Sequence, residues 1–311
     1  MTDYSVRARG LTRRFGEFVA VDHVSFDIQH GQIWGFLGPN GAGKSTTIRM
    51  LCGILDPSEG TAEVLGEDVR KNPEAVKSQI GYMSQKFSLW NDLTVLENLQ
   101  FYAGVYGLHG RAQDERIRYW LGRLSLGDRV NQLSGTLSGG FRQRLALACS
   151  VLHQPRMIFL DEPTAGVNPV SRRTFWTLID EFARDGATIM VTTHYMDEAE
   201  HCDELAFILA GRIIAQGSPD DIRTNQMRGV VVELQTDATA VALTRVDNHP
   251  LVHDAFLYGS NIHATVASAQ AAQEVMDDLR KSGFPLREAR IIPASLEDVF
   301  VALVEAQEQG P

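Results

Sequence analysis

Hydrophobic and polar residues alternate in the N-terminal part of the chain. Apolar side chains recur at every second or third position over residues 4–37, and Gly31 and Gly35 punctuate the pattern. Alternation of this kind predicts short β-strands. Residues 44–55 then show an apolar helical face, and the turn at 56–60 closes it, so we expect the chain to pass from strands into a helix.

The middle of the chain changes from helical periodicity to an alternation of strands and helices. Over residues 93–152 apolar positions repeat at helical spacing. After them the pattern predicts, in order, a strand at 156–163, a helix at 174–185, a strand at 187–194, a short helix at 196–202 and a hairpin at 203–217. Strands that alternate with helices indicate a mostly parallel sheet covered on both faces.

The pattern changes again near residues 222–229. Beyond this point it predicts a strand at 230–235, a helix at 238–247, two short strands within 251–267, a helix at 268–282, a strand near 286–292 and a last helix from residue 295. This order predicts two domains, a large one at 1–222 and a small α+β accessory domain at 229–311.

Composition narrows the class of protein. The 311 residues are 44% hydrophobic, which is ample for a packed core. The apolar runs are of buried-strand length, far below the roughly 20 residues of a transmembrane helix, and the N-terminus lacks the apolar core of a secretory signal. Cys52, Cys149 and Cys202 are odd in number and lie among apolar residues, which fits reduced thiols. We therefore expect a soluble, cytoplasmic protein.

The balance of charge bears on the partners of the chain. The formal net charge is −10. Neutralising phosphates supplies most of the affinity for a nucleic-acid backbone, so an acidic chain is a poor candidate for binding one. No nucleic-acid partner is expected.

The stretch "GPNGAGKST" matches the phosphate-loop pattern of a glycine, four residues and then Gly-Lys-Ser. It follows an apolar strand and opens a helix, so its backbone N–H groups and the helix dipole can hold an anion. Lys44 would reach the β- and γ-phosphates, and Ser45 would bind Mg²⁺. The predicted nucleotide-binding residues here are Gly38, Pro39, Asn40, Gly41, Ala42, Gly43, Lys44, Ser45 and Thr46.

The stretch "RMIFLDEP" at 156–163 supplies a second apolar strand, which ends in two carboxylates. Asp161 would hold the Mg²⁺ shell, and Glu162 would orient and polarise the attacking water. Phosphoryl transfer depends mainly on such positioning and charge stabilisation. Acidic residues at strand ends are also common as helix caps, but next to a phosphate loop the catalytic interpretation is favoured.

The stretches at 193–219 and 295–305 resemble exporter ATPases of the drug- and lipid-efflux branch. From about residue 4 to residue 222 the chain resembles the ATP-binding subunit of an ATP-binding-cassette (ABC) transporter. Besides the two motifs above, the resemblance rests on "LSGGF" at 137–141, a glutamine at 85, the loop "AGVN" at 165–168 and a histidine at 194, in that family's order. It implies an α/β P-loop ATPase fold with a mixed sheet core, an antiparallel β subdomain and a helical subdomain at about 86–152.

The resemblance implies roles for residues around one ATP site. Phe15 would stack on the adenine ring, and Gln85 would reach the nucleotide and its Mg²⁺. Lys44, Glu162 and His194 would be the catalytic residues. Taken singly, Phe15 could belong to the core, Gln85 to the surface and His194 to a helix terminus; it is their common order that is specific. The implied cofactors are ATP and Mg²⁺.

The turn at "LSGGF" implies half of a second ATP site. The N–H groups of Ser138, Gly139 and Gly140 at a helix N-terminus suit a γ-phosphate. In the family, two cassettes meet head to tail, so that each ATP lies between one chain's phosphate loop and the other's turn. Two positions depart from the family pattern: Phe141 replaces a glutamine and Asn168 replaces an aspartate.

The segment after the glutamine loop is rich in aromatic residues. In the family it lines the groove that receives a cytoplasmic helix of the membrane subunit. The resemblance therefore predicts that Phe87, Leu89 and Trp90 contact a multi-span membrane permease, whereas Phe101 and Tyr102 are expected in the core of the helical subdomain.

The function implied is an ATPase that powers a membrane exporter through ATP-driven dimerisation of two cassettes, with a homodimer expected on the inner face of the cell membrane. The alternative is a soluble ABC ATPase that acts on ribosomes or nucleic acid. Such proteins usually carry two cassettes or an inserted coiled coil. A single cassette and an acidic charge favour the exporter.

Overall fold

The computed structural model divides into two compact units, Met1–Gln216 and Gly217–Pro311. Helix α8 (Pro219–Gln226), which spans the predicted boundary at 222, falls in the second unit. None of the helices in the described part of the chain is long and apolar enough to cross a bilayer. The structure describes residues 4–86, 88–227, 229–237, 239–283 and 286–308.

A six-stranded sheet in the order β10-β9-β3-β8-β7-β6 forms the centre of the first unit. The pairs β6–β7, β7–β8, β8–β3 and β3–β9 are all parallel. Strands buried on both faces are rich in apolar residues, as β3 (IWGFL) and most of β7 (MIFLD) are. The prediction of a mostly parallel core is thereby confirmed. The strands are β3 (Ile33–Leu37), β6 (Ile80–Met83), β7 (Met157–Asp161), β8 (Thr188–Thr193), β9 (Glu204–Leu209) and β10 (Arg212–Gly217).

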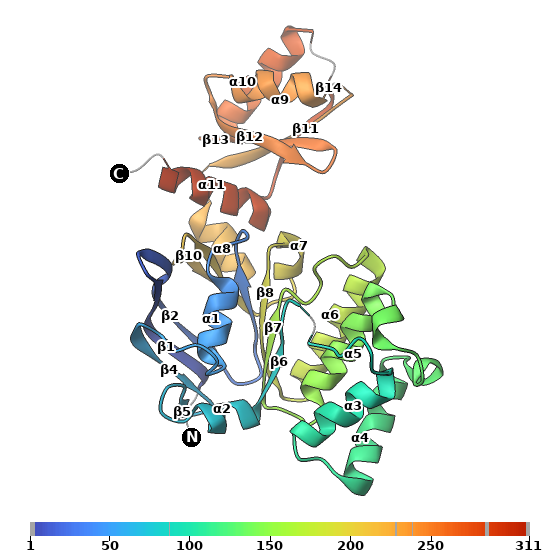
Figure 1. The fold of residues 1–311 in the computed structure, drawn as a ribbon. Coiled ribbons are helices and arrows are strands. Elements are labelled where there is room, and N and C mark those ends of the chain that lie inside the picture. The colour runs from blue at the N-terminus through green and yellow to red at the C-terminus, as the bar shows by residue number, and fades with distance from the viewer. Residues whose placement is uncertain (1–3, 87, 228, 238, 284–285, 309–311) are drawn as a thin grey trace. The chain divides into compact units, whose positions relative to one another are not determined.

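Alternate residues of the central strands enter two separate hydrophobic cores. On β7, Ile158 and Leu160 join the core shared with the larger helices, while Met157 and Phe159 join the core that contains α1 (Lys44–Leu51). Figure 1 shows α1 on one side of the strands and α5 and α6 on the other. The helices of the first core are α3 (Val95–Val105), α4 (Gly110–Arg123), α5 (Gly139–Val151) and α6 (Pro169–Arg184).

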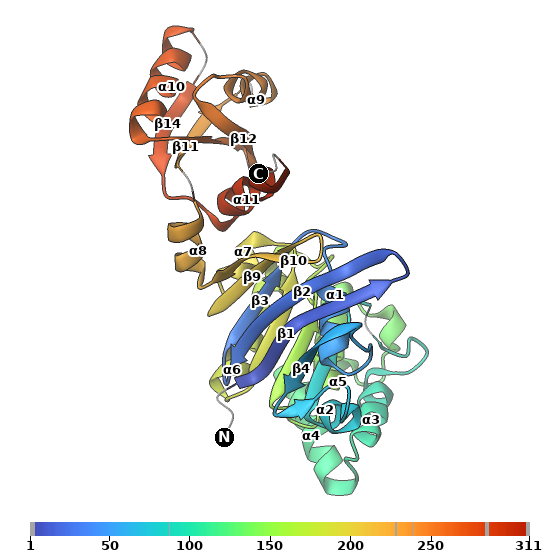
Figure 2. The same ribbon diagram turned by 90° about the vertical axis from the view of Figure 1, so that its left-hand side faces the viewer.

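An antiparallel sheet in the order β2-β1-β4-β5 covers the face of the unit that holds α1 (Figure 2). Its long hairpin turns at Gly16, which has φ 58°, and sets Phe15 opposite Phe18. This sheet is the antiparallel subdomain expected from the alternating pattern. Its strands are β1 (Tyr4–Phe15), β2 (Phe18–Gln29), β4 (Glu59–Val64) and β5 (Glu67–Asp68).

The remaining elements of the first unit are short. Helix α1 ends at Leu51, earlier than its apolar face predicts, because Gly53 takes a left-handed conformation at φ 63°. Such a glycine commonly ends a helix. The short elements are α2 (Pro73–Gln79), η1 (Gly127–Arg129), η2 (Ser134–Thr136) and α7 (Met196–Ala199).

The second unit is built on an antiparallel sheet in the order β12-β13-β11-β14. Helices α9 and α10 pack against one face and share an apolar core with it. The order of elements confirms the predicted α+β class. The elements that follow α8 are β11 (Val230–Thr236), α9 (Thr239–Asp247), β12 (Val252–Tyr258), β13 (Asn261–Val266), α10 (Ala269–Lys281), β14 (Leu286–Ile292) and α11 (Leu296–Glu308).

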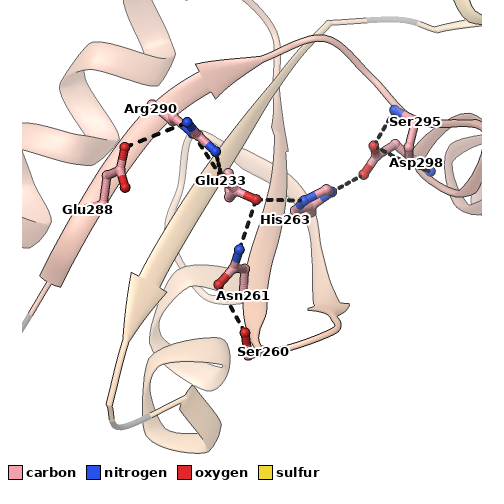
Figure 3. Close-up of polar contacts among 8 residues, drawn as sticks. All are labelled: Glu233, Ser260, Asn261, His263, Glu288, Arg290, Ser295 and Asp298. Atoms are coloured by element: carbon pink, nitrogen blue, oxygen red, sulfur yellow. Dashed lines mark hydrogen bonds and ion pairs between the residues drawn. The ribbon is translucent and has the colours of Figure 1, made fainter.

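The opposite face of this sheet carries a network of charged residues centred on Glu233 (Figure 3). Arg290 donates to Glu233 Oε1 from Nε at 2.9 Å and from Nη2 at 2.7 Å, and Asn261 donates to Oε2 at 2.9 Å. Burial opposes the ionised carboxylate, but the hydrogen bonds from Arg290 and Asn261 outweigh it and lower the pKa of Glu233. Glu233 is therefore an ionised carboxylate whose hydrogen-bond donors are supplied by neighbouring side chains.

The network continues to the first turn of α11. His263, which is 2% exposed, lies with Nε2 3.7 Å from Glu233 Oε2 and with Nδ1 2.7 Å from Asp298 Oδ1. Asp298 Oδ2 also accepts hydrogen bonds from the backbone N–H and the hydroxyl of Ser295, both at 2.6 Å. Asp298 thus caps the helix and holds the histidine at the same time, and it fixes α11 to the sheet.

Candidate nucleotide-binding site

The phosphate loop joins β3 to α1 and is packed too tightly for side chains at two of its glycines. A Cβ on Gly38 would lie 2.2 Å from the carbonyl oxygen of Ile208, and one on Gly43 would lie 2.6 Å from that of Ala20. Gly43 also has φ 109°, which L-residues rarely adopt. Glycine is therefore required at both ends of the loop by its close contact with β9 and β2.

Lys44 is buried and points back into the loop that precedes it. Its Nζ donates to the carbonyl oxygens of Gly38 at 2.7 Å and Pro39 at 3.1 Å, and lies 3.0 Å from Glu162 Oε1. A buried ammonium needs acceptors, and here the loop and the carboxylate supply them. The predicted phosphate-binding lysine is thus held at the loop. Phosphate oxygens could take the place of its present acceptors, the two carbonyl oxygens and the carboxylate.

Asp161 lies at the end of β7 beside two hydroxyl groups. Ser45 Oγ donates to Asp161 Oδ1 at 2.9 Å, and Thr192 Oγ1 donates to the same atom at 2.8 Å. Burial raises the pKa of the Asp161 carboxyl. No sequence motif pointed to Thr192; the available signal was its place on the strand that ends just before His194.

These oxygen atoms suit Mg²⁺. Among the described residues, no group of three or more His, Cys, Asp or Glu side chains can hold a metal ion by itself. Mg²⁺ is commonly bound through one or two carboxylates, with substrate phosphates and waters filling the remaining positions. One carboxylate at Asp161 and one hydroxyl at Ser45, next to a phosphate loop, fit that pattern.

The other predicted catalytic residues and Gln85 lie around the carboxylate of Glu162. Gln85 Nε2 donates to Glu162 Oε2 at 3.1 Å, and His194 Nδ1 lies 3.4 Å from the same oxygen. Glu162 has φ 47°, a strained backbone conformation for a residue with a side chain, and its N–H donates to the Thr192 carbonyl oxygen at 3.1 Å. Together with Lys44, three residues predicted from separate motifs converge at the Glu162 carboxylate.

The turn at Ser138 begins α5, on the other side of the sheet from α1. Ser138 is the N-cap residue, and its hydroxyl makes no capping hydrogen bond. Ser138 and Gly139 are exposed, while a Cβ on Gly140 would lie 2.7 Å from Ser171 Oγ. Because α1 and α5 pack in different cores, the two predicted phosphate-binding turns of one chain belong to opposite faces of the sheet.

Both departures from the family pattern have structural contacts. The guanidinium groups of Arg129 and Arg144 lie over the Phe141 ring, 4.1 Å and 5.3 Å from its centroid. Asn168 is the N-cap of α6, and its side chain accepts a hydrogen bond from the N–H of Ser171 at 2.9 Å. Phe141 therefore anchors the start of α5, and Asn168 caps the next helix.

The predicted partner-contact residues differ in their placement. Phe87 lies outside the described residues. Leu89 is partly buried and lines an apolar groove of about 280 Å³, while Trp90 is 54% exposed beside it. Phe101 is 43% exposed, so its expected place in the core was wrong. Phe101 packs edge-on against Trp90 instead, with ring centroids 5.8 Å apart, which extends the exposed aromatic surface.

Comparison with known proteins identifies the family. The sequence pattern of the ABC transporter family matches residues 21–165. The chain is 36% identical to the Nod factor export ATP-binding protein I of Ralstonia nicotianae, over 94% of this chain and 92% of that protein. The chain belongs to the ABC transporter ATP-binding family. It is also 33% identical to the daunorubicin/doxorubicin resistance ATP-binding protein DrrA of Streptomyces peucetius, over 96% of this chain and 92% of that protein.

Another relative is more similar to this chain in sequence, but its match covers a smaller part of the chain. The chain is 50% identical over 218 residues to the probable multidrug ABC transporter ATP-binding protein YbhF of Escherichia coli. That match covers 70% of this chain, which spans only 38% of the length of YbhF.

Solved structures match the first part of the molecule. One, titled as the ATP-binding subunit of an ABC transporter, has a TM-score of 0.65 and 29% identity, covering 70% of this chain and 92% of that one. Another, the ADP conformation of the cassette MJ1267, has a TM-score of 0.63 and 26% identity, covering 72% and 96%. The family and fold predicted from the ordered motifs are thereby confirmed.

Proposed function

We propose that this chain binds and hydrolyses ATP and thereby powers a membrane exporter. The observation that carries the proposal is the convergence on the Glu162 carboxylate of Lys44, Gln85 and His194, within 3.4 Å or less of its oxygens. Phosphoryl transfer needs a cation at the transferred phosphate and a group that orients the attacking water, and this cluster supplies both. The export role follows the printed names of the relatives.

Each residue of the cluster would have its own role in ATP hydrolysis. Lys44 would exchange the carbonyl oxygens of the loop for β- and γ-phosphate oxygens. Glu162 would orient the attacking water and polarise it, while Gln85 and His194 hold the Glu162 carboxylate in place. Ser45 and Asp161, with Gln85, would hold Mg²⁺, which when bound neutralises charge on the phosphates. Most of the catalysis is then positioning and charge stabilisation.

A complete site would need a second copy of the chain. The turn at Ser138 offers exposed backbone N–H groups at a helix N-terminus, which suits a γ-phosphate. The phosphate loop of the same chain opens a helix in the opposite core. We infer a head-to-tail homodimer in which each ATP lies between the loop of one copy and the turn of the other.

The membrane permease would dock at the apolar groove beside Leu89 and Trp90. Tyr82, Met83 and Tyr102 line this groove together with Leu89, and the exposed Trp90 follows Leu89 in the sequence. An exposed apolar groove of this kind marks a protein contact. The chain would then lie on the inner face of the cell membrane, attached through its partner.

The test uses the full-length Glu162→Gln protein, whose closed dimer should persist because hydrolysis is blocked. With Mg-ATP we expect it to elute as a dimer and to retain a multi-span membrane protein from gently solubilised membranes. Phosphate release should fall by about 100-fold or more.

The matched control is Lys44→Ala, which removes the phosphate-binding cation and should stay monomeric with ATP. Dimers that form equally with and without ATP would contradict the proposal. Retention of ribosomal proteins or nucleic acid, instead of a membrane protein, would favour the soluble alternative.

A further inference from the structure

The hairpin that carries Phe15 also carries an arginine packed on the same ring. We propose that Arg13 is a positioning residue for the nucleotide base: its guanidinium covers one face of Phe15 and leaves the other face to adenine. The inference rests on the proposed ATP-binding function and adds to it a residue that sets how firmly the base is held.

The contact between the two side chains is direct. Arg13 Cζ lies 4.6 Å from the centroid of the Phe15 ring. The two residues are two positions apart on β1, and this contact places their side chains together although the pairing with β2 is irregular between Arg13 and Arg14. Phe15 is 47% exposed, so much of its ring surface stays open with Arg13 in place.

Backbone contacts fix the arginine and its hairpin. Arg13 Nη1 donates to the carbonyl oxygen of Asp56 at 2.8 Å. Ser58 is bonded to the same strand twice: its N–H donates to the Thr12 carbonyl oxygen at 2.8 Å, and its hydroxyl accepts from the N–H of Arg14 at 3.0 Å. The turn at 56–60 follows α1, the helix that the phosphate loop opens, so ring and loop are tied to one element.

The same hairpin contacts the phosphate loop at a distance from Phe15 that a nucleotide can span. The carbonyl oxygen of Ala20 closes against Gly43 of the loop. Phe18, which pairs with Phe15, lies two residues from Ala20, or about 7 Å along the strand at the usual rise per residue. A ribose and its first phosphate bridge such a separation, so a base on Phe15 and phosphates at Gly43 are compatible.

The expected effect follows from the physics of the stack. A guanidinium over a ring is attracted by the negative face of the π-system, and at an exposed site this changes an equilibrium by about two- to fivefold. With Arg13 in place the ring is held ready before the nucleotide arrives, so less side-chain freedom is lost on binding. Removing Arg13 should weaken contacts to the base and leave contacts to the phosphates unchanged.

The experiment compares two ligands on the full chain by titration calorimetry: ATP, and inorganic tripolyphosphate, each with Mg²⁺. Arg13→Ala and Arg13→Gln should each raise the Kd for ATP about two- to fivefold and leave the Kd for tripolyphosphate unchanged. Glutamine keeps a donor for Asp56 and lacks the cation, so it serves if the alanine variant folds poorly.

The matched control is Arg14→Ala. Arg14 carries the same charge on the same strand, but its Nε pairs with Glu59 Oε1 at 3.3 Å. Its loss should change the Kd values of both ligands by the same small factor. If Arg13→Ala behaves like Arg14→Ala, or weakens tripolyphosphate as much as ATP, Arg13 acts only through its charge and the inference is wrong.

Two further variants separate this inference from the function it rests on. Phe15→Ala should weaken ATP more than Arg13→Ala does and spare tripolyphosphate; unchanged ATP binding would overturn the role of both residues. Lys44→Ala should weaken both ligands strongly. If it weakens neither, the proposed nucleotide site itself is wrong.

Discussion

Asp161 and Glu233 are buried carboxylates, one in each unit of the molecule, and their surroundings move their pKa values in opposite directions. Asp161 faces two hydroxyl groups and lies next to Glu162, and burial raises its pKa. Glu233 faces Arg290 and Asn261, whose hydrogen bonds outweigh burial and lower its pKa. Asp161, the proposed Mg²⁺ ligand, accepts hydrogen bonds from neutral hydroxyl groups, whereas Glu233 accepts them from a cation.

The difference separates function from structure in this chain. A buried charge without a matched cation costs folding free energy, so it is retained where a ligand completes it. A buried charge with all its partners holds the fold together, as Glu233 does between β11 and β14. Burial and charge alone do not distinguish the two cases, whereas the partners do.

The largest effect is expected from Asp161→Asn. Phosphate release at saturating Mg-ATP should fall by at least about 100-fold, because the carboxylate proposed to hold Mg²⁺ is lost. The free energy of unfolding in urea should stay equal or rise, because asparagine keeps an acceptor for Ser45 and Thr192 and removes a buried charge. A stability loss as large as that of Glu233→Gln would break the comparison.

The reverse outcome is expected from Glu233→Gln. The free energy of unfolding should fall by about 2 kcal/mol, because Arg290 and His263 lose their carboxylate. Denaturant unfolding followed by circular dichroism measures this. Glu288→Gln is the control: its carboxylate also approaches Arg290, at 3.8 Å, but it is exposed, so the change should stay within about 0.5 kcal/mol.

Acid should remove the stabilisation that the ionised Glu233 provides. Because the folded-state pKa of Glu233 lies below the usual value of 4.5, its ionised form contributes stability that is present above pH 4.5 and is lost as the pH falls through the folded-state pKa. The difference in unfolding free energy between wild type and Glu233→Gln should therefore shrink below pH 4.5. A difference that stays constant down to pH 2 would contradict this assignment.

The smallest effect concerns a satisfied polar residue of the first unit. Asn168→Ala removes the acceptor for the Ser171 N–H and should cost about 1 kcal/mol of unfolding free energy. Asn168→Asp restores the family residue and keeps the cap, so it should change stability by only a few tenths of a kcal/mol. If both substitutions cost equally, the cap is not what makes position 168 matter for stability.

Local sequence patterns predicted most elements of both units. The predicted helix at 268–282 is α10 (Ala269–Lys281), and the predicted strand near 286–292 is β14. Periodicity records which side of an element is buried, so element type and approximate bounds can be predicted from it. The phosphate loop is equally local, because its glycines, lysine and serine are contiguous in the sequence.

Contacts between distant segments could not be predicted in this way. His263 and Asp298 meet across the second unit, and neither lies in a recognisable motif. The contact of Thr192 with Asp161 depends on strand order, which periodicity does not encode. The exposure of Phe101 likewise depends on which helices pack against α3.

The placement of α1 and α5 in opposite cores has a kinetic consequence. In the proposed head-to-tail dimer a single copy would not close its own turn over its own phosphate loop, so hydrolysis in dilute solution would become a second-order process in the chain. Its specific activity then rises with concentration until dimers saturate. Two copies held on one permease would be at a fixed high local concentration, and their turnover would no longer depend on how many other copies are present.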